Sequence, residues 1–158
     1  MPSSKPIKRH ESLKPMSRDH HQGLQLCWKL RTGLQRNVDP ARMLAYCKRF
    51  HAEHLVPHFG LEEEAIFPIL DNDHELVKRA LAEHRGLTRL FTGIDDPLNR
   101  VSRIEEELEA HIRFEERVLF EAIESVATEK ELDRIDALHG SLEPNDGGDP
   151  VVEDVFWV

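Results

Sequence analysis

Apolar residues recur every three or four positions in four long segments of the chain, and short stretches rich in Asp, Asn, Gly and Pro separate these segments. This spacing is typical of one face of an α-helix. It predicts long helices over residues 17–34, 40–70, 73–92 and 97–126, and a shorter pattern predicts a fifth helix over residues 129–139. Four long helices with short connections predict an all-α, up-down-up-down four-helix bundle with a short extra C-terminal helix.

Residues that favour helix starts support these boundaries. Ser17 is a candidate N-cap, and Asp39-Pro40 combines an N-cap with a proline in the first turn. Asp95-Asp96-Pro97 opens the fourth long helix in the same way, although the capping-box spacing of Ser102 and Glu105 offers an alternative start.

Prolines inside the second long helix predict irregular turns. Pro57 removes one backbone donor, so we expect a kink just before His58. Pro68 predicts a second irregularity near the end of the same helix.

The two ends of the chain lie outside the bundle pattern, which is assigned to residues 16–126. Residues 1–15 contain prolines and basic side chains and predict a flexible, extended arm. Residues 127–158 predict the short helix, opened by a Thr128–Glu131 capping box, and then an acidic tail. The apolar end, Val155-Phe156-Trp157-Val158, either folds back onto the body of the protein or docks on a neighbour.

Composition narrows the class of protein. A chain of 158 residues is long enough for one domain with its own core. Its net charge of −9 argues against nucleic acid as a partner, because phosphate binding needs a basic surface. No segment has the pattern of a membrane span or a secretory signal, so we expect a cytoplasmic protein. Cys27 and Cys47 lie in helical patterns and are expected to be buried, reduced thiols.

Two of the predicted helices carry the same polar motif. His58 is followed four residues later by Glu62, and His111 by Glu115, and each motif continues with a second Glu and then a Phe. Residues at positions i and i+4 lie on one face of a helix, so each pair can bind a metal through one nitrogen and one oxygen. These donors suit iron, manganese or zinc.

A single His–Glu pair of this spacing is usually a solvated surface pair. Here both pairs lie within the apolar faces of their helices, where an unpaired carboxylate would be costly. This position favours a metal site over the surface interpretation.

Further histidines fall on the apolar faces of the other two helices. His84 lies within the face of the third helix. In the first helix, the spacing from Leu24 favours His20, whereas the likeness of residues 21–24 to residues 84–87 favours His21. His51 and His54 are candidate hydrogen-bond partners or alternative ligands, but polar residues beside a helix contact are the favoured interpretation.

Together these residues resemble the hemerythrin-like (HHE cation-binding) four-helix bundle domains, over about residues 17–126. The resemblance rests on Arg18-Asp19-His20-His21, His58-x-x-x-Glu62-Glu63 followed by Phe67-Pro68, Glu83-His84, and His111-x-x-x-Glu115-Glu116 followed by Leu119-Phe120. It implies a non-heme di-iron centre with bridging Glu62 and Glu115 and terminal histidines. The expected ligands are His20, His58, Glu62, His84, His111 and Glu115, with zinc or manganese as alternative metals.

One departure from the family pattern affects the expected function. Oxygen-carrying hemerythrins have a second histidine one turn before the first in the third helix, where this sequence has Ala80. In this respect the chain is more similar to bacterial and F-box-linked hemerythrin-like domains. The missing ligand would leave one iron with an open position that could admit water, O2, NO or peroxide.

Three functions follow as expectations. The first is a di-iron protein that binds or senses O2, NO or iron itself. The second is a redox enzyme that acts on peroxide, O2 or NO, or an iron donor for iron–sulfur cluster repair, although the repair proteins carry an N-terminal cysteine-bearing domain that this sequence lacks. The third is a helical interaction module or a structural zinc protein. Ferritin-like bundles rank lower, because their Glu-x-x-His motif has the reverse order.

Overall fold

The computed structural model describes residues 9–142 and 154–158, and within them every regular element is helical. The α-helices are α1 (Lys14–Gln35), α2 (Pro40–Phe50), α3 (Val56–Leu61), α4 (Glu75–Thr92), α5 (Pro97–Phe114), α6 (Phe120–Val126) and α7 (Glu129–Leu142). A π-helical turn joins α2 to α3 (His51–Leu55), another follows α3 (Glu62–Ile66), and a third joins α5 to α6 (Glu115–Leu119). Short 3₁₀ turns precede α1 (Glu11–Leu13) and follow the second π turn (Phe67–Ile69).

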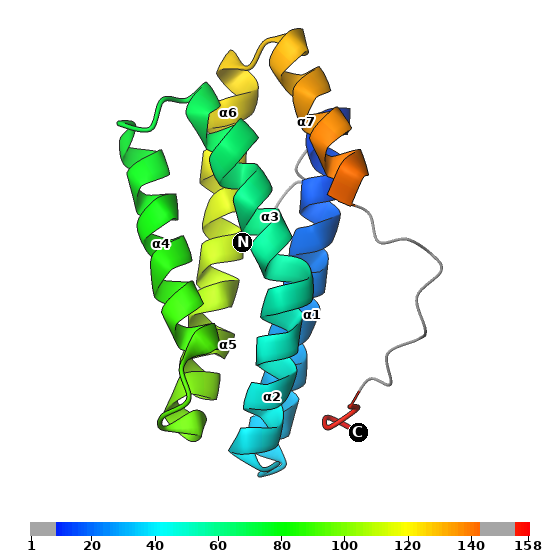
Figure 1. Cartoon of the computed structure of the whole chain (residues 1–158), viewed down its shortest axis with the longest axis vertical. Helices are drawn as coiled ribbons and strands as arrows, with labels where there is room; N and C mark the ends of the chain where they lie inside the picture. The colour runs from blue at the N-terminus through cyan, green and yellow to red at the C-terminus, as the bar shows by residue number, and fades with distance from the viewer. Residues whose placement is uncertain (1–8, 143–153) are drawn as a thin grey trace, which may run out of the picture.

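These elements form four antiparallel rods, as Figure 1 shows: α1, α2 continued by α3, α4, and α5 continued by α6. The fifth helix, α7, lies outside the four rods and packs against α3 and the turn before α1. The prediction of an all-α, up-down-up-down bundle with an extra C-terminal helix is therefore confirmed.

Several predicted helix starts are confirmed by their hydrogen bonds. The Asp39 side chain accepts from the Ala41 amide at 3.0 Å before α2, and Asp96 is the N-cap of α5. Thr128 and Glu131 form a capping box before α7, in which the Thr128 amide donates to Glu131 Oε1 at 2.9 Å and the Glu131 amide donates to Thr128 Oγ1 at 3.2 Å.

Other boundaries differ from the prediction. Helix α4 begins at Glu75 rather than Asp73, because the His74 side chain accepts the Leu76 amide and is the N-cap. Helix α7 continues past Gly140, where a stop was predicted, because no glycine of the described residues has the left-handed backbone that ends a helix.

The first helix begins at Lys14 rather than Ser17, and the prediction of an extended arm is wrong for residues 11–15. Leu13 and Met16 are completely buried, so packing holds the chain against the bundle. Ser12 Oγ also donates to Asp136 of α7 at 2.7 Å. Residues 1–8 of the predicted arm lie outside the described residues.

The apolar C-terminal end folds back onto the protein. Phe156 is only 2% exposed, and its ring lies 5.2 Å from the ring of Tyr46. A Cβ atom on Gly33 would lie 2.9 Å from the Phe156 ring and 2.5 Å from the Met43 sulfur, so this contact needs a glycine. The predicted acidic tail at residues 143–153 lies outside the described residues.

The irregularities predicted from proline are present. The Val56 amide donates to the carbonyl of His51, five residues back, in the π-helical turn directly before Pro57. Pro68 lies in the 3₁₀ turn that ends this rod.

The apolar interior is divided into two clusters. One cluster includes Leu30, Phe91 and Leu108, and the other includes Met16, Phe67 and Phe120. Along each rod the polar residues of the predicted metal site lie between these clusters, so the fold places a polar layer across an otherwise apolar core.

Candidate metal centre

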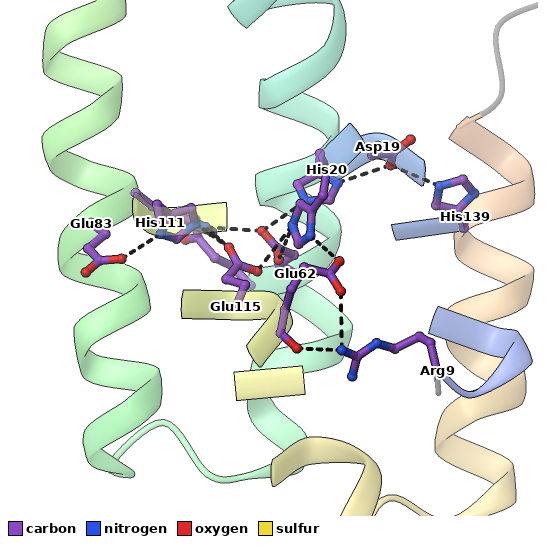
Figure 2. A network of polar contacts seen from close by, with 12 residues as sticks. Arg9, Asp19, His20, Glu62, Glu83, His111, Glu115 and His139 are labelled. Atoms are coloured by element: carbon purple, nitrogen blue, oxygen red, sulfur yellow. Dashed lines mark hydrogen bonds and ion pairs between the residues drawn. The ribbon is translucent and has the colours of Figure 1, made fainter. Parts of the chain in front are cut away.

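The polar layer contains six buried side chains, contributed by all four rods (Figure 2). They are the six residues predicted from the sequence: His20, His58, Glu62, His84, His111 and Glu115. In the first helix the structure places His20 in the buried layer, whereas His21 is exposed, with its Nε2 3.4 Å from Gln25 Nε2.

The six residues form two overlapping groups, each with the geometry of a metal site. His20 and His58 belong to one group and His84 and His111 to the other, while both groups contain Glu62 and Glu115. Within each group the candidate ligand atoms all lie within 4.8 Å of one another. Two carboxylates shared by two pairs of imidazoles are suited to bridging two ions.

The distances show how Glu62 faces both groups. Its Oε1 lies 3.4 Å from His58 Nε2 and 3.2 Å from His84 Nε2, and its Oε2 lies 3.9 Å from His20 Nε2.

Glu115 is placed in the same way. Its Oε2 lies 3.7 Å from His20 Nε2, its Oε1 lies 3.5 Å from His84 Nε2, and the same Oε1 contacts His111 Nε2. Both carboxylates therefore lie between the two pairs of histidines.

Several of these buried atoms have no hydrogen-bond partner. They are the Nε2 atoms of His20, His58 and His111, both carboxylate oxygens of Glu62, and Oε2 of Glu115. Unpaired polar atoms in a protein interior are costly, and these converge on one place. Metal coordination would satisfy them, so the residues fit a metal centre.

The other nitrogen of each imidazole is held by a carboxylate outside the cluster. The four Nδ1–carboxylate distances are 2.6 Å for His20–Glu116, 3.1 Å for His58–Asp19, 2.8 Å for His84–Glu63 and 2.8 Å for His111–Glu83. An ionised carboxylate only accepts, so each Nδ1–H donates outward and the Nε2 atom of each imidazole faces the cluster. Metal-binding histidines commonly have this arrangement.

These four outer carboxylates close a ring around the bundle. Asp19 of the first rod holds a histidine of the second, Glu63 of the second holds one of the third, Glu83 of the third holds one of the fourth, and Glu116 of the fourth holds His20 of the first. Each rod therefore contributes one outer carboxylate, and the histidine of each rod is hydrogen-bonded to a carboxylate of another rod.

None of the four outer carboxylates was predicted to have a role in the site. A signal was present, because each of them is adjacent in sequence to a predicted ligand: Asp19 to His20, Glu63 to Glu62, Glu83 to His84, and Glu116 to Glu115.

Two residues outside the four rods complete the network in Figure 2, and both were missed. Arg9 Nη2 lies 3.2 Å from Glu116 Oε2 and also donates to the Glu116 carbonyl. His139 of α7 lies 3.1 Å from the same Asp19 oxygen that holds His58.

The two shared carboxylates occupy equivalent places in their rods. Each is the first residue of a π-helical turn, and its carbonyl accepts the amide of a Phe five residues later, Phe67 for Glu62 and Phe120 for Glu115. Such turns are rare and often lie at functional sites. The repeated motif found in the sequence is therefore a repeated backbone geometry.

Charges within the layer shift the pKa values of its members. Burial by itself would lower the pKa of His58, but the Glu62 and Asp19 carboxylates outweigh burial and raise this pKa to about 9. Burial opposes ionisation of Glu62, yet the facing imidazoles lower its pKa below the usual range. For His20 and His111 burial is the largest effect, and their pKa values are lowered.

The remaining candidates lie elsewhere. His51 is buried and stacks on Phe91 at 5.2 Å, and His54 is exposed beside Phe50, so neither belongs to the candidate ligand groups. Cys27 and Cys47 are buried free thiols, and burial raises the pKa of each to about 12.

A cavity of about 640 Å³ opens beside the layer, and its wall includes His20, His58 and His111. The cavity therefore reaches from exposed residues of α1 to the outer sides of these three histidines. Among the described residues, no helix has the length and apolar character needed to cross a membrane.

Comparison with known families gives one match. The model of the hemerythrin HHE cation-binding domain matches residues 11–102, which include the first four of the six buried residues. His111 and Glu115 lie beyond the matched range, but the fold brings them into the same cluster. No curated protein and no solved structure matches the chain.

Proposed function

Since the chain belongs to the hemerythrin HHE cation-binding domain family, we propose that its buried cluster holds two iron ions and binds or senses a small ligand such as O2 or NO. The observation that carries this proposal is the pair of overlapping groups that share Glu62 and Glu115. A single ion would leave half of the imidazoles without a role, whereas two bridged ions use all six residues.

The donor set favours iron among the candidate metals. It consists of imidazole nitrogens and carboxylate oxygens, and the two cysteines of the chain are not part of it. Such sites take iron, manganese or zinc, and a structural zinc site closes with four protein ligands of its own. Two sites that share both carboxylates are better suited to a bridged pair of redox-active ions.

The protein's own residues would prepare this site before metal arrives. The outer carboxylates fix the orientation and tautomer of every histidine, and the two apolar clusters exclude water on both sides of the layer. Ala80, buried one turn before His84, offers no further donor. Bound iron would supply a redox-active centre with positions open to an external ligand.

Metal analysis of untagged protein tests the proposal. We expect about two irons per chain, and a visible spectrum that changes when the reduced protein meets O2 or NO. Zinc alone, or no metal, would contradict the proposal. Glu115→Ala should lose both the metal and the spectral change.

The cavity favours a second candidate function, a redox enzyme that acts on peroxide, O2 or NO. Its volume of about 640 Å³ beside three of the histidines leaves space for such a substrate to enter and for its product to leave. Turnover of hydrogen peroxide or NO by the reduced protein, lost in Glu115→Ala, would distinguish an enzyme from a reversible binder.

A further inference from the structure

The cavity beside the metal layer is built from parts of α1, the α2–α3 rod, α5 and α7. Its inner wall contains His20, His58 and His111, and its outer part reaches exposed residues of α1 such as Arg18 and Gln22. A molecule that fills the cavity would therefore extend from the surface to the histidines of the metal centre.

We propose that this cavity binds an amphipathic organic anion, with its apolar part inside and its anionic group at Arg18. The existence of this site does not depend on the identity of the metal. The statement that the bound molecule lies against a metal centre rests on the proposed function.

Size and wall chemistry support an organic ligand. Binding sites for small organic molecules usually have volumes of about 300–1,000 Å³ and mostly apolar walls. This cavity falls in that range, and side chains such as Leu55, Phe59, Leu108 and Ile112 line it. A diatomic ligand would leave most of the volume and most of this apolar wall unused.

The charges at the cavity favour an anion. Asp19 accepts hydrogen bonds from two histidines, and Glu53 is paired with Arg49 at 3.1 Å. Arg18 is exposed and, within the described part of the chain, has no carboxylate partner. The unpaired charge at the rim is thus positive, and a guanidinium readily binds a carboxylate or sulfonate group.

Two fluorescent probes with the same ring system separate the apolar and ionic parts of the proposal. The anion 8-anilinonaphthalene-1-sulfonate and its neutral analogue N-phenyl-1-naphthylamine are titrated into the protein as isolated, and we expect each to bind at one site. Arg18→Ala should weaken binding of the anion by about threefold to tenfold and leave the neutral probe unchanged. Arg85→Ala, which removes an exposed arginine of α4 away from the cavity, is the matched control.

A second variant tests whether the cavity is the place of binding. Gln22 is exposed at the rim, so Gln22→Trp adds bulk there without disturbing the core, and it should abolish binding of both probes. Unchanged binding in both variants, or an equal loss of the two probes in Arg18→Ala, would overturn the proposal. If Gln22→Trp does not fold, the two probes with Arg18→Ala still decide the question.

Metal content is measured on the same samples and keeps the two proposals apart. Protein that lacks metal but binds the anion through Arg18 would refute the proposed function and leave the cavity site supported. Protein that holds two irons but binds neither probe would refute the cavity site alone.

Discussion

Oε1 of Glu116 lies 2.6 Å from Nδ1 of His20, although 96 positions separate the two residues in the chain. The same relationship, a carboxylate of one rod holding a histidine of another, occurs at His58, His84 and His111. The metal centre therefore depends on residues that do not themselves face it.

Glu116→Gln should weaken metal binding by about tenfold to a hundredfold, because a neutral amide holds the His20 imidazole less firmly than a carboxylate does. Competition with a chelator of known affinity measures the change. Glu106→Gln, at an exposed position of α5 with no partner among the described residues, is the control. Equal affinities of the two variants would contradict a role for Glu116.

Substitutions within the cluster should distinguish ligands that belong to both candidate metal groups from ligands that belong to only one, through the number of metal ions that each variant retains. Glu62→Gln affects both groups, so we expect well below one metal ion per chain. His84→Ala affects one group, so about one ion should remain. Elemental analysis of both variants is the measurement, and similar metal contents would argue against bridging carboxylates.

Metal removal should lower the melting temperature by about 10 °C, because the buried nitrogens and oxygens that converge on the centre then lack partners. Calorimetry of the metal-free and reloaded forms at one pH tests this. Coincident melting of the two forms would show that the cluster is satisfied without metal.

The metal-free protein should become less stable as the pH rises from about 7 to 9. The pKa of His58 is raised to about 9 in the folded protein, above its value in the unfolded chain. Protonated His58 therefore stabilises the folded state fully at a pH below the unfolded pKa. This stabilisation is lost as the pH rises through the folded pKa. The pKa of His84 is also raised, and those of His20 and His111 are lowered, so the last two lose their protons below this window.

Urea unfolding at several pH values measures this dependence, which should correspond to roughly one to two protons per chain. The metal-loaded protein is the control, because metal-bound imidazoles carry no proton at Nε2. A free energy of unfolding that rises across this window in the metal-free protein would contradict the assignment.

Phe156→Ala should destabilise the protein by about 3 kcal/mol, because it empties a buried site against Gly33 and Met43. Metal content should not change, since Phe156 belongs to the apolar cluster and not to the candidate ligand groups. Urea unfolding combined with elemental analysis tests both statements. A wild-type unfolding midpoint would mean that the C-terminal end does not pack on the protein in solution.

The fold and the inner residues of the candidate site could be predicted from the sequence for physical reasons. Capping residues such as Asp39 and Thr128 identify helix starts, and a carboxylate such as Glu62 on an apolar face is too costly to be incidental.

The roles of the outer carboxylates could not be predicted from the sequence in this way. Residues such as Asp19 and Glu83 lie beside the apolar stripe, and in the sequence they look like ordinary surface residues. Their partners are on other rods, and helical periodicity contains no information about how rods are aligned. The buried start at Leu13 was missed for a related reason, because tertiary packing rather than an N-cap decides where α1 begins.

The π-helical turns at Glu62 and Glu115 restrict how the length of this chain can vary. Each turn closes with a hydrogen bond over five residues, one more than an α-helical turn uses. Deleting one residue there would restore a regular α-helical turn and leave the rest of the rod in nearly the same register. It would, however, shift the Glu62 or Glu115 carboxylate that begins the turn away from the histidines of the other rods. We therefore expect insertions and deletions in related sequences to fall in the connections at 36–39 and 70–74, and not within these two turns.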